Sequence, residues 1–205
     1  MTAKEREAVI DLLCEFFEVA LHNILYVRKL YPEGIFEKRK KYGVMVYQSI
    51  HPQVNEYITE SLKAVKFHCK TNQLKQLFVS IVSSGGKLVH ERFVFDILNL
   101  QNSFENDPVY LKLEQNMRDF CLKLHTSATY LQPLPEDATF RIMLHTTEYS
   151  NLSFTDEPAF LDFPWIYVNE TKCKMTEFEI IPLHTLDTDS IVLQAYVEKN
   201  SSDSL

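Results

Sequence analysis

The segment 2–29 carries apolar residues at helical spacing around most of its circumference. It contains neither glycine nor proline, and Thr2 and Glu5 fit a capping box, in which the two side chains bond free backbone N–H groups. A helix that is apolar on most sides is normally buried. The pattern therefore predicts one long helix at the centre of the core. Its apolar positions are Val9, Ile10, Leu12, Leu13, Phe16, Phe17, Val19, Ala20, Leu21, Ile24 and Leu25.

Two further segments repeat apolar residues every three or four positions. One begins at Pro52, whose fixed backbone suits the first position of a helix, and continues through Ile58 and Val65. The other opens at Pro108 and extends to Leu124. The spacing predicts a second and a third helix in these segments.

Alternation of apolar and polar residues predicts strands in the rest of the chain. Leu77–Val82 leads into the turn signal Ser83–Gly86, and an alternating segment around 92–97 returns from it. The segments 140–146 and 191–198 alternate in the same way. Together with the helices, these strands predict an α+β domain in which three helices pack on a largely antiparallel sheet. We expect one domain over 1–199 and a flexible tail over 200–205.

Glycine is scarce, with 4 residues among 205. Gly43 follows a basic run, where a hairpin turn or bulge is expected. The four cannot spell a dinucleotide-binding or phosphate-cradling glycine motif, which excludes both classes of site. The net charge of −7 argues against a broad nucleic-acid surface, which is normally basic, so we expect no direct contact with nucleic acid. No apolar run approaches the roughly 20 residues of a membrane span.

The histidines and cysteines predict no catalytic or metal site. Their spacings match no zinc pattern, and adjacent helical positions such as His68 and Cys69 point apart. Cys121 and His125 are one helical turn apart, but Cys121 lies on the apolar stripe, where a structural cysteine is the commoner state. We therefore expect a protein that is not an enzyme and needs no cofactor.

The long segment after the strand at 140–146 has weak periodicity but many aromatic residues. Loops longer than about 12–15 residues are uncommon in compact domains unless they are functional or disordered, and aromatic residues argue against disorder. It is either a lid on its own sheet or a clamp over a partner peptide. If the strand 140–146 lies at a sheet edge, a partner strand can add to it. The aromatic residues are Phe154, Phe160, Phe163, Trp165 and Tyr167.

Several strings spread along the chain resemble the HORMA-domain family, and within it the mitotic-arrest-deficient-like accessory subunits of translesion DNA polymerase zeta. They are Cys14–Ala20, Ile24–Arg28, Tyr31-Pro32, Gly34–Phe36, Lys38–Tyr42, Asp162–Trp165, Ile181–Leu183 and Tyr196–Glu198. The resemblance implies a core over about 1–147 and a C-terminal "safety belt" over about 148–199. In that family the belt closes over a client peptide that adds to the sheet edge.

The resemblance also implies site residues. Tyr57 and Trp165 match positions that hold the peptide of the polymerase catalytic subunit, and we expect Tyr167 of the same belt segment to bind this peptide too. We add the apolar face of the receiving strand to this client site: Phe140, Ile142 and Leu144.

Three other residues match a surface that contacts the C-terminal domain of the translesion scaffold polymerase, a deoxycytidyl transferase: Ile180, Gln194 and Tyr196. Gln194 and Tyr196 also share the polar face of a strand whose other face is apolar, which on pattern alone favours a solvated strand, whereas the resemblance favours a partner surface. Arg118 matches a position that pairs one HORMA domain with another of the same or a different kind.

The expected function is a non-catalytic, peptide-clamping adaptor that links the polymerase zeta catalytic subunit to the scaffold polymerase in translesion synthesis and the DNA damage response. The expected location is the nucleus, and also the cytoplasm and spindle. The resemblance further implies a remodelling ATPase of the AAA+ class and activators of the anaphase-promoting complex as partners. The alternatives are a spindle-checkpoint HORMA protein and a plain scaffold whose lid stays closed. The basic run Lys38–Lys41 is either a solvated strand or a nuclear-import or DNA-contacting patch.

Overall fold

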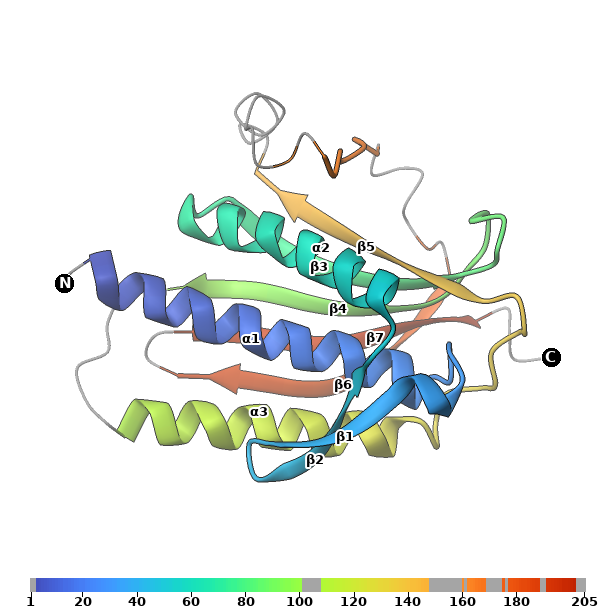
Figure 1. The fold of residues 1–205 in the computed structure, drawn as a ribbon, viewed down its shortest axis with the longest axis horizontal. Coiled ribbons are helices and arrows are strands. Elements are labelled where there is room, and N and C mark those ends of the chain that lie inside the picture. The colour runs from blue at the N-terminus through green and yellow to red at the C-terminus, as the bar shows by residue number, and fades with distance from the viewer. Residues whose placement is uncertain are drawn as a thin grey trace.

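The computed structural model describes residues 3–100, 108–147, 160, 162–168, 175, 177–188 and 191–201. These residues form three helices, a two-stranded sheet and a five-stranded sheet (Figure 1). The elements are α1 (Ala3–Val27), β1 (Phe36–Lys41), β2 (Val44–Ser49), α2 (Pro52–Lys70), β3 (Leu74–Val82), β4 (Val89–Leu100), α3 (Pro108–Ser127), β5 (Thr139–Thr146), β6 (Phe178–Asp187) and β7 (Ile191–Asn200). The predicted α+β class with three helices on an antiparallel sheet is confirmed.

The large sheet has the strand order β5-β3-β4-β7-β6, and all its neighbouring strands are antiparallel. The last two strands of the chain therefore add beside β4, so β5 and β6 are the two edges. The three helices lie on one side of this sheet (Figure 1). The small β1–β2 hairpin packs against α1 and α3 and turns at Tyr42-Gly43, where both residues have positive φ.

The core lies between the helices and the sheet, and α1 is its central element. Phe16, Phe17 and Leu21 of α1 are at most 1% exposed, as the all-round apolar pattern predicts. Phe16 and Phe17 each make an edge-on contact with Phe95 of β4. Burying such side chains contributes about 1.5–3 kcal/mol each. The strands β6 and β7 belong to the same core, through Leu183, Leu186, Ile191, Leu193, Ala195 and Val197.

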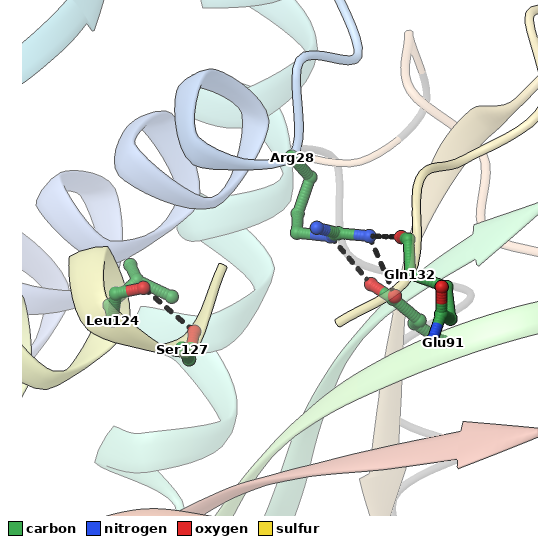
Figure 2. Close-up of polar contacts among 5 residues, drawn as sticks. All are labelled: Arg28, Glu91, Leu124, Ser127 and Gln132. Carbon is green, nitrogen blue, oxygen red and sulfur yellow. Dashed lines mark hydrogen bonds and ion pairs between the residues drawn. The ribbon is translucent and has the colours of Figure 1, made fainter. Parts of the chain in front are cut away.

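Arg28, just after the end of α1, joins three distant parts of the chain through a buried ion pair and a hydrogen bond (Figure 2). The Arg28 guanidinium donates to both carboxylate oxygens of Glu91 on β4, at 2.7 Å each, and to the backbone carbonyl of Gln132 at 2.6 Å. The two side chains are 5% and 4% exposed. Since a buried charge that loses its partner is strongly destabilising, this contact fixes the end of α1 against the sheet.

Some sequence predictions need correction or fall outside the described residues. Asn200 belongs to β7, although the sequence pattern predicts it in the tail. The pattern does not delineate β6, because Pro182 and a bulge between Pro182 and His184 interrupt its alternation. The capping box rests on Thr2 and on the side chain of Glu5, which lie outside the described part, as do Phe154 and residues 202–205.

Candidate functional site

The predicted receiving strand, β5, is an edge strand. Among the described residues it pairs with β3 alone. Phe140, Ile142 and Leu144 pair with Ile81, Val79 and Leu77 of β3, so they lie on the face that carries the helices. Ile142 is buried, whereas Phe140 and Leu144 are half-buried.

Tyr57 of α2 stands over this edge. The backbone N–H of Ile142 donates to the Tyr57 hydroxyl at 3.1 Å, so this donor points away from β3. Along a strand of an antiparallel sheet, the backbone N–H and C=O groups of every second residue point to the same side. The backbone groups of Phe140 and Leu144 therefore also face the open edge. Burial raises the pKa of the Tyr57 hydroxyl, which stays neutral at physiological pH.

The segment 162–168 continues this surface with aromatic rings. The Phe163 ring centroid lies 5.8 Å from that of Tyr57 and 6.1 Å from that of Trp165. Tyr57 also makes an edge-on contact with Phe140, with centroids 5.4 Å apart. One aromatic series thus runs from β5 through α2 to the segment after β5. Trp165 is half-buried against the core.

Tyr167 does not join this series, since it is 78% exposed. Phe163 does join it and is absent from the sequence-based site. The sequence could have indicated Phe163 as a site residue. Phe163 and Trp165 are two positions apart in the string Asp162–Trp165 and so share a face of an extended chain. We call Tyr57, Phe140, Ile142, Leu144, Phe163 and Trp165 the edge site.

A cleft of about 410 Å³ adjoins the edge site, between α2 and the residues 162–163. Tyr57 and Phe163 give it aromatic walls. Its other lining residues are polar or charged: Gln53, Glu56, Glu60, Lys63 and Asp162. Lys63 forms an ion pair with Glu60 at 2.6 Å, one helical turn away.

The residues predicted to contact the scaffold polymerase come together on the other side of the sheet. Tyr196 pairs with Pro182, and Ile180 pairs with Glu198, so the register gives Ile180, Tyr196 and Gln194 one common face. The opposite face of β7 is buried against the helices, as the alternation predicts. Ile180 is 56% exposed, and Tyr196 is half-buried. We call Ile180, Gln194 and Tyr196 the outer-sheet surface.

Charged side chains adjoin the outer-sheet surface. Arg92 of β4 donates to Glu198 at 3.4 Å and lies over the Phe78 ring. Burial raises the pKa of the Glu198 carboxyl, and Arg92 opposes that rise. Burial and the carboxylates of Glu198 and Asp96 raise the pKa of Tyr196, so its phenol remains a neutral hydrogen-bonding group.

Arg118 lies apart from both surfaces. It is exposed on α3, and its guanidinium reaches toward the β1–β2 turn at Gly43. Apart from Tyr167, the predicted residues therefore lie in three regions: the edge site, the outer-sheet surface and the exposed face of α3.

The residues weighed for catalysis have structural contacts. His125 bonds the backbone carbonyl of Cys121 at 2.8 Å, and burial raises the pKa of the Cys121 thiol to about 12. Within the described ranges, no group of three or more His, Cys, Asp or Glu side chains is placed to hold a metal ion. None of the helices in that part of the chain is long and apolar enough to cross a membrane.

Comparison with known proteins gives consistent matches over nearly the whole chain. The HORMA domain family model matches residues 10–158. The mitotic spindle assembly checkpoint protein MAD2B of Homo sapiens is 39% identical over 95% of this chain and 92% of its own length. The Danio rerio protein of the same name is 38% identical over 97% and 94%. DNA polymerase zeta subunit 2 of Drosophila melanogaster is 26% identical over 89% and 93%.

Solved structures share the fold at lower sequence identity. A chain in the crystal structure of the Mitotic Checkpoint Complex aligns with a TM-score of 0.78 and 21% identity, covering 93% of this chain and 97% of that one. The C. elegans protein HTP-2, bound to HTP-3 closure motif 1, aligns with a TM-score of 0.71 and 14% identity over 94% and 86%. The chain therefore belongs to the HORMA-domain family, in the group of the MAD2B and DNA polymerase zeta subunit 2 proteins.

Proposed function

We propose that this chain is a non-catalytic, peptide-clamping adaptor and an accessory subunit of DNA polymerase zeta in translesion synthesis and the DNA damage response. The observation that carries the proposal is the edge site. It combines a strand edge that pairs with no other described strand, where the outward N–H groups of Phe140 and Leu144 can bond an added strand, with an aromatic wall that selects side chains. A client segment of the polymerase catalytic subunit adds to β5 as a further strand.

The course of the chain after β5 supports the proposal that the C-terminal segment is a belt. The chain leaves one edge of the sheet, contacts α2 through Phe160 and Phe163, and re-enters the sheet at the opposite edge as β6. A client on β5 would thus lie between the sheet and a segment tethered at both edges. Such enclosure acts mainly on the dissociation rate. The solved structures of HTP-2 bound to closure motifs support this mode of binding.

The outer-sheet surface is free to recruit a second partner while the client is bound. We propose that it binds the C-terminal domain of the scaffold polymerase, and that the exposed face of α3 around Arg118 pairs with another HORMA domain. A role beside a DNA polymerase requires the protein to act in the nucleus. The names DNA polymerase zeta subunit 2 and DNA polymerase zeta processivity subunit, carried by three relatives, support the polymerase assignment.

The second candidate function is regulation of the spindle checkpoint and of the anaphase-promoting complex. The name MAD2B, mitotic spindle assembly checkpoint protein, carried by relatives 38–39% identical, favours it. Both functions use the same edge site and differ in the client.

The test is a pull-down from nuclear extract, read by mass spectrometry, with the wild type and three variants. Trp165→Ala removes an aromatic anchor of the edge site and should weaken client binding by about 2 kcal/mol or more, since tryptophan is among the commonest hot-spot residues of protein interfaces. Tyr196→Ala should spare the client and lose the scaffold polymerase. Tyr130→Ala, which changes an exposed tyrosine outside all three regions, is the matched control.

Recovery of the polymerase zeta catalytic subunit by wild type and control, with loss in Trp165→Ala, is the expected result. Recovery of anaphase-promoting-complex activators without polymerase would favour the checkpoint function. Equal recovery of every partner by all four proteins would remove the edge site and the outer-sheet surface from the proposal.

A further inference from the structure

The lining of the cleft beside the edge site contains more acidic than basic residues. Glu56, Glu60 and Asp162 line it together with one cation, Lys63, so its lining has a net negative charge. Lys63 is held by Glu60. Glu56 and Asp162 form no ion pair within the described residues, and both are exposed.

The position of the acids relative to β5 follows from helical spacing. Gln53, Glu56, Glu60 and Lys63 are three or four residues apart, so they form one stripe along α2 on the side of Tyr57. A strand added to β5 would turn alternate side chains toward the helices, as Phe140 and Ile142 do. Those side chains would meet Tyr57 and this acidic stripe.

We propose that the client segment carries a lysine or arginine whose charged group lies in this cleft between Glu56 of α2 and Asp162 of the belt. This inference rests on the function proposed above and names the chemistry of its client. The aliphatic stem of such a side chain packs on Tyr57 and Phe163, while its cation remains at the polar rim. Since one carboxylate comes from the helix and the other from the belt, the cation also links the belt to α2 across the client.

Lysine or arginine fits this cleft better than an acidic or purely apolar side chain. An acidic side chain would be repelled by Glu56 and Asp162, and an apolar one would gain no attraction from either carboxylate. The charge of the cleft thus adds a requirement that the aromatic wall alone does not impose.

The probe is an array of short overlapping peptides that covers the polymerase zeta catalytic subunit of the same organism. The peptide that binds the wild type is then labelled, and its affinity is measured by fluorescence anisotropy. When its basic residues are replaced by methionine one at a time, only one of these substitutions should weaken binding. The double variant Glu56→Gln/Asp162→Asn should weaken the unchanged peptide about three- to tenfold at about 0.1 M salt, and this difference should disappear near 1 M salt because such charges are screened.

Two controls make the result specific. Glu114→Gln changes an exposed carboxylate of α3 outside the cleft and should leave the affinity unchanged. Glu56→Lys should bind the wild-type peptide poorly and regain affinity when the critical basic residue of the peptide becomes glutamate.

The outcomes separate this inference from the proposed function. If a peptide binds and Trp165→Ala abolishes that binding, but every basic residue can be replaced without effect, the cleft has no such role while the clamp stands. A peptide whose binding Glu56→Gln/Asp162→Asn leaves unchanged would overturn the inference in the same way. If no peptide of the catalytic subunit binds at all, the proposed function itself fails.

Discussion

At the scale of single residues, His22 shows how burial sets a pH dependence. Its side chain is 3% exposed, and its Nδ1 accepts the backbone N–H of Ser49 at 3.3 Å. Burial lowers the pKa of His22 from 6.5 to about 4. Between these values the unfolded chain binds a proton that the folded chain does not bind. The contribution of His22 to stability is therefore complete above about pH 6.5 and is lost as the pH drops toward 4.

We expect His22 to remove about 2 kcal/mol of unfolding free energy on going from neutral pH to about pH 5. The measurement is urea unfolding at a series of pH values for the wild type and His22→Gln, whose amide keeps an acceptor for Ser49. Burial also lowers the pKa of His68 and His184, but these groups are present in both proteins. If both proteins lose stability in parallel as the pH falls, His22 is not the group responsible.

Much of the residue-level site follows from the sequence, and the remainder depends on tertiary contacts. The apolar alternation of Phe140, Ile142 and Leu144 correctly places them on one face of a strand. The bond between the Ile142 N–H and the Tyr57 hydroxyl joins residues 85 positions apart, so no local pattern contains it. The acidic lining of the cleft cannot be predicted from the sequence for the same reason. Glu56 and Asp162 line one cleft only because the segment 162–168 packs near α2 in the folded chain.

At the scale of the elements, the two edge strands differ in how much of them the sequence reveals. The alternation of β5 predicts its range to within a residue, because apolar residues such as Phe140 and Ile142 alternate with polar ones such as Arg141. The strand β6 has no such alternation, since it lies at the far edge and carries Pro182. The strand order is also absent from the sequence, because β7 pairs with β4 across an insertion that contains α3 and β5.

The direction of the backbone donors on β5 gives a prediction at this scale. The N–H of Leu144 faces the open edge, whereas those of Arg141 and Met143 face β3. Leu144→Pro should therefore keep the pairing with β3, since proline is tolerated where the N–H points away from the sheet. It should weaken client binding, because one donor to the added strand is lost.

The matched control is Leu144→Val, which also trims the side chain but keeps the N–H. We expect the two variants to have similar melting temperatures and the proline variant to bind the client peptide about tenfold more weakly, as for a lost hydrogen bond of roughly 1–1.5 kcal/mol. Equal affinities would mean that the client does not pair with β5.

At the scale of the whole molecule, the chain after residue 147 shares one hydrophobic core with the chain before it. The later part supplies β6 and β7, and β7 pairs along β4 from Glu91 to Leu100. Leu183, Leu186, Leu193 and Val197 are at most 3% exposed in the common core. The division at about residue 147 that the family resemblance implies thus separates two parts that share one hydrophobic core in this structure.

We expect a chain that ends at residue 147 not to fold. It would lose two of the five strands of the large sheet and expose the core-facing side of β4 and α3. Thermal unfolding followed by circular dichroism should show no cooperative transition, whereas a chain ending at residue 201 should melt like the full protein. A sharp transition in the shorter chain would mean that helices and three strands suffice.

The two edge strands of the large sheet, β5 and β6, differ in whether a further strand can pair with them. At β6, Pro182 lacks a backbone donor, a bulge breaks the register, and α3 packs alongside (Figure 1). At β5 the donors face outward. Assembly by strand addition continues into a fibre only when every subunit offers two usable edges. A subunit with a single usable edge ends such an assembly after one addition. Within the part of the chain that the structure describes, β5 is thus the edge at which the large sheet can be extended, and a strand added there covers the outward donors of β5 and keeps them from pairing with a second copy.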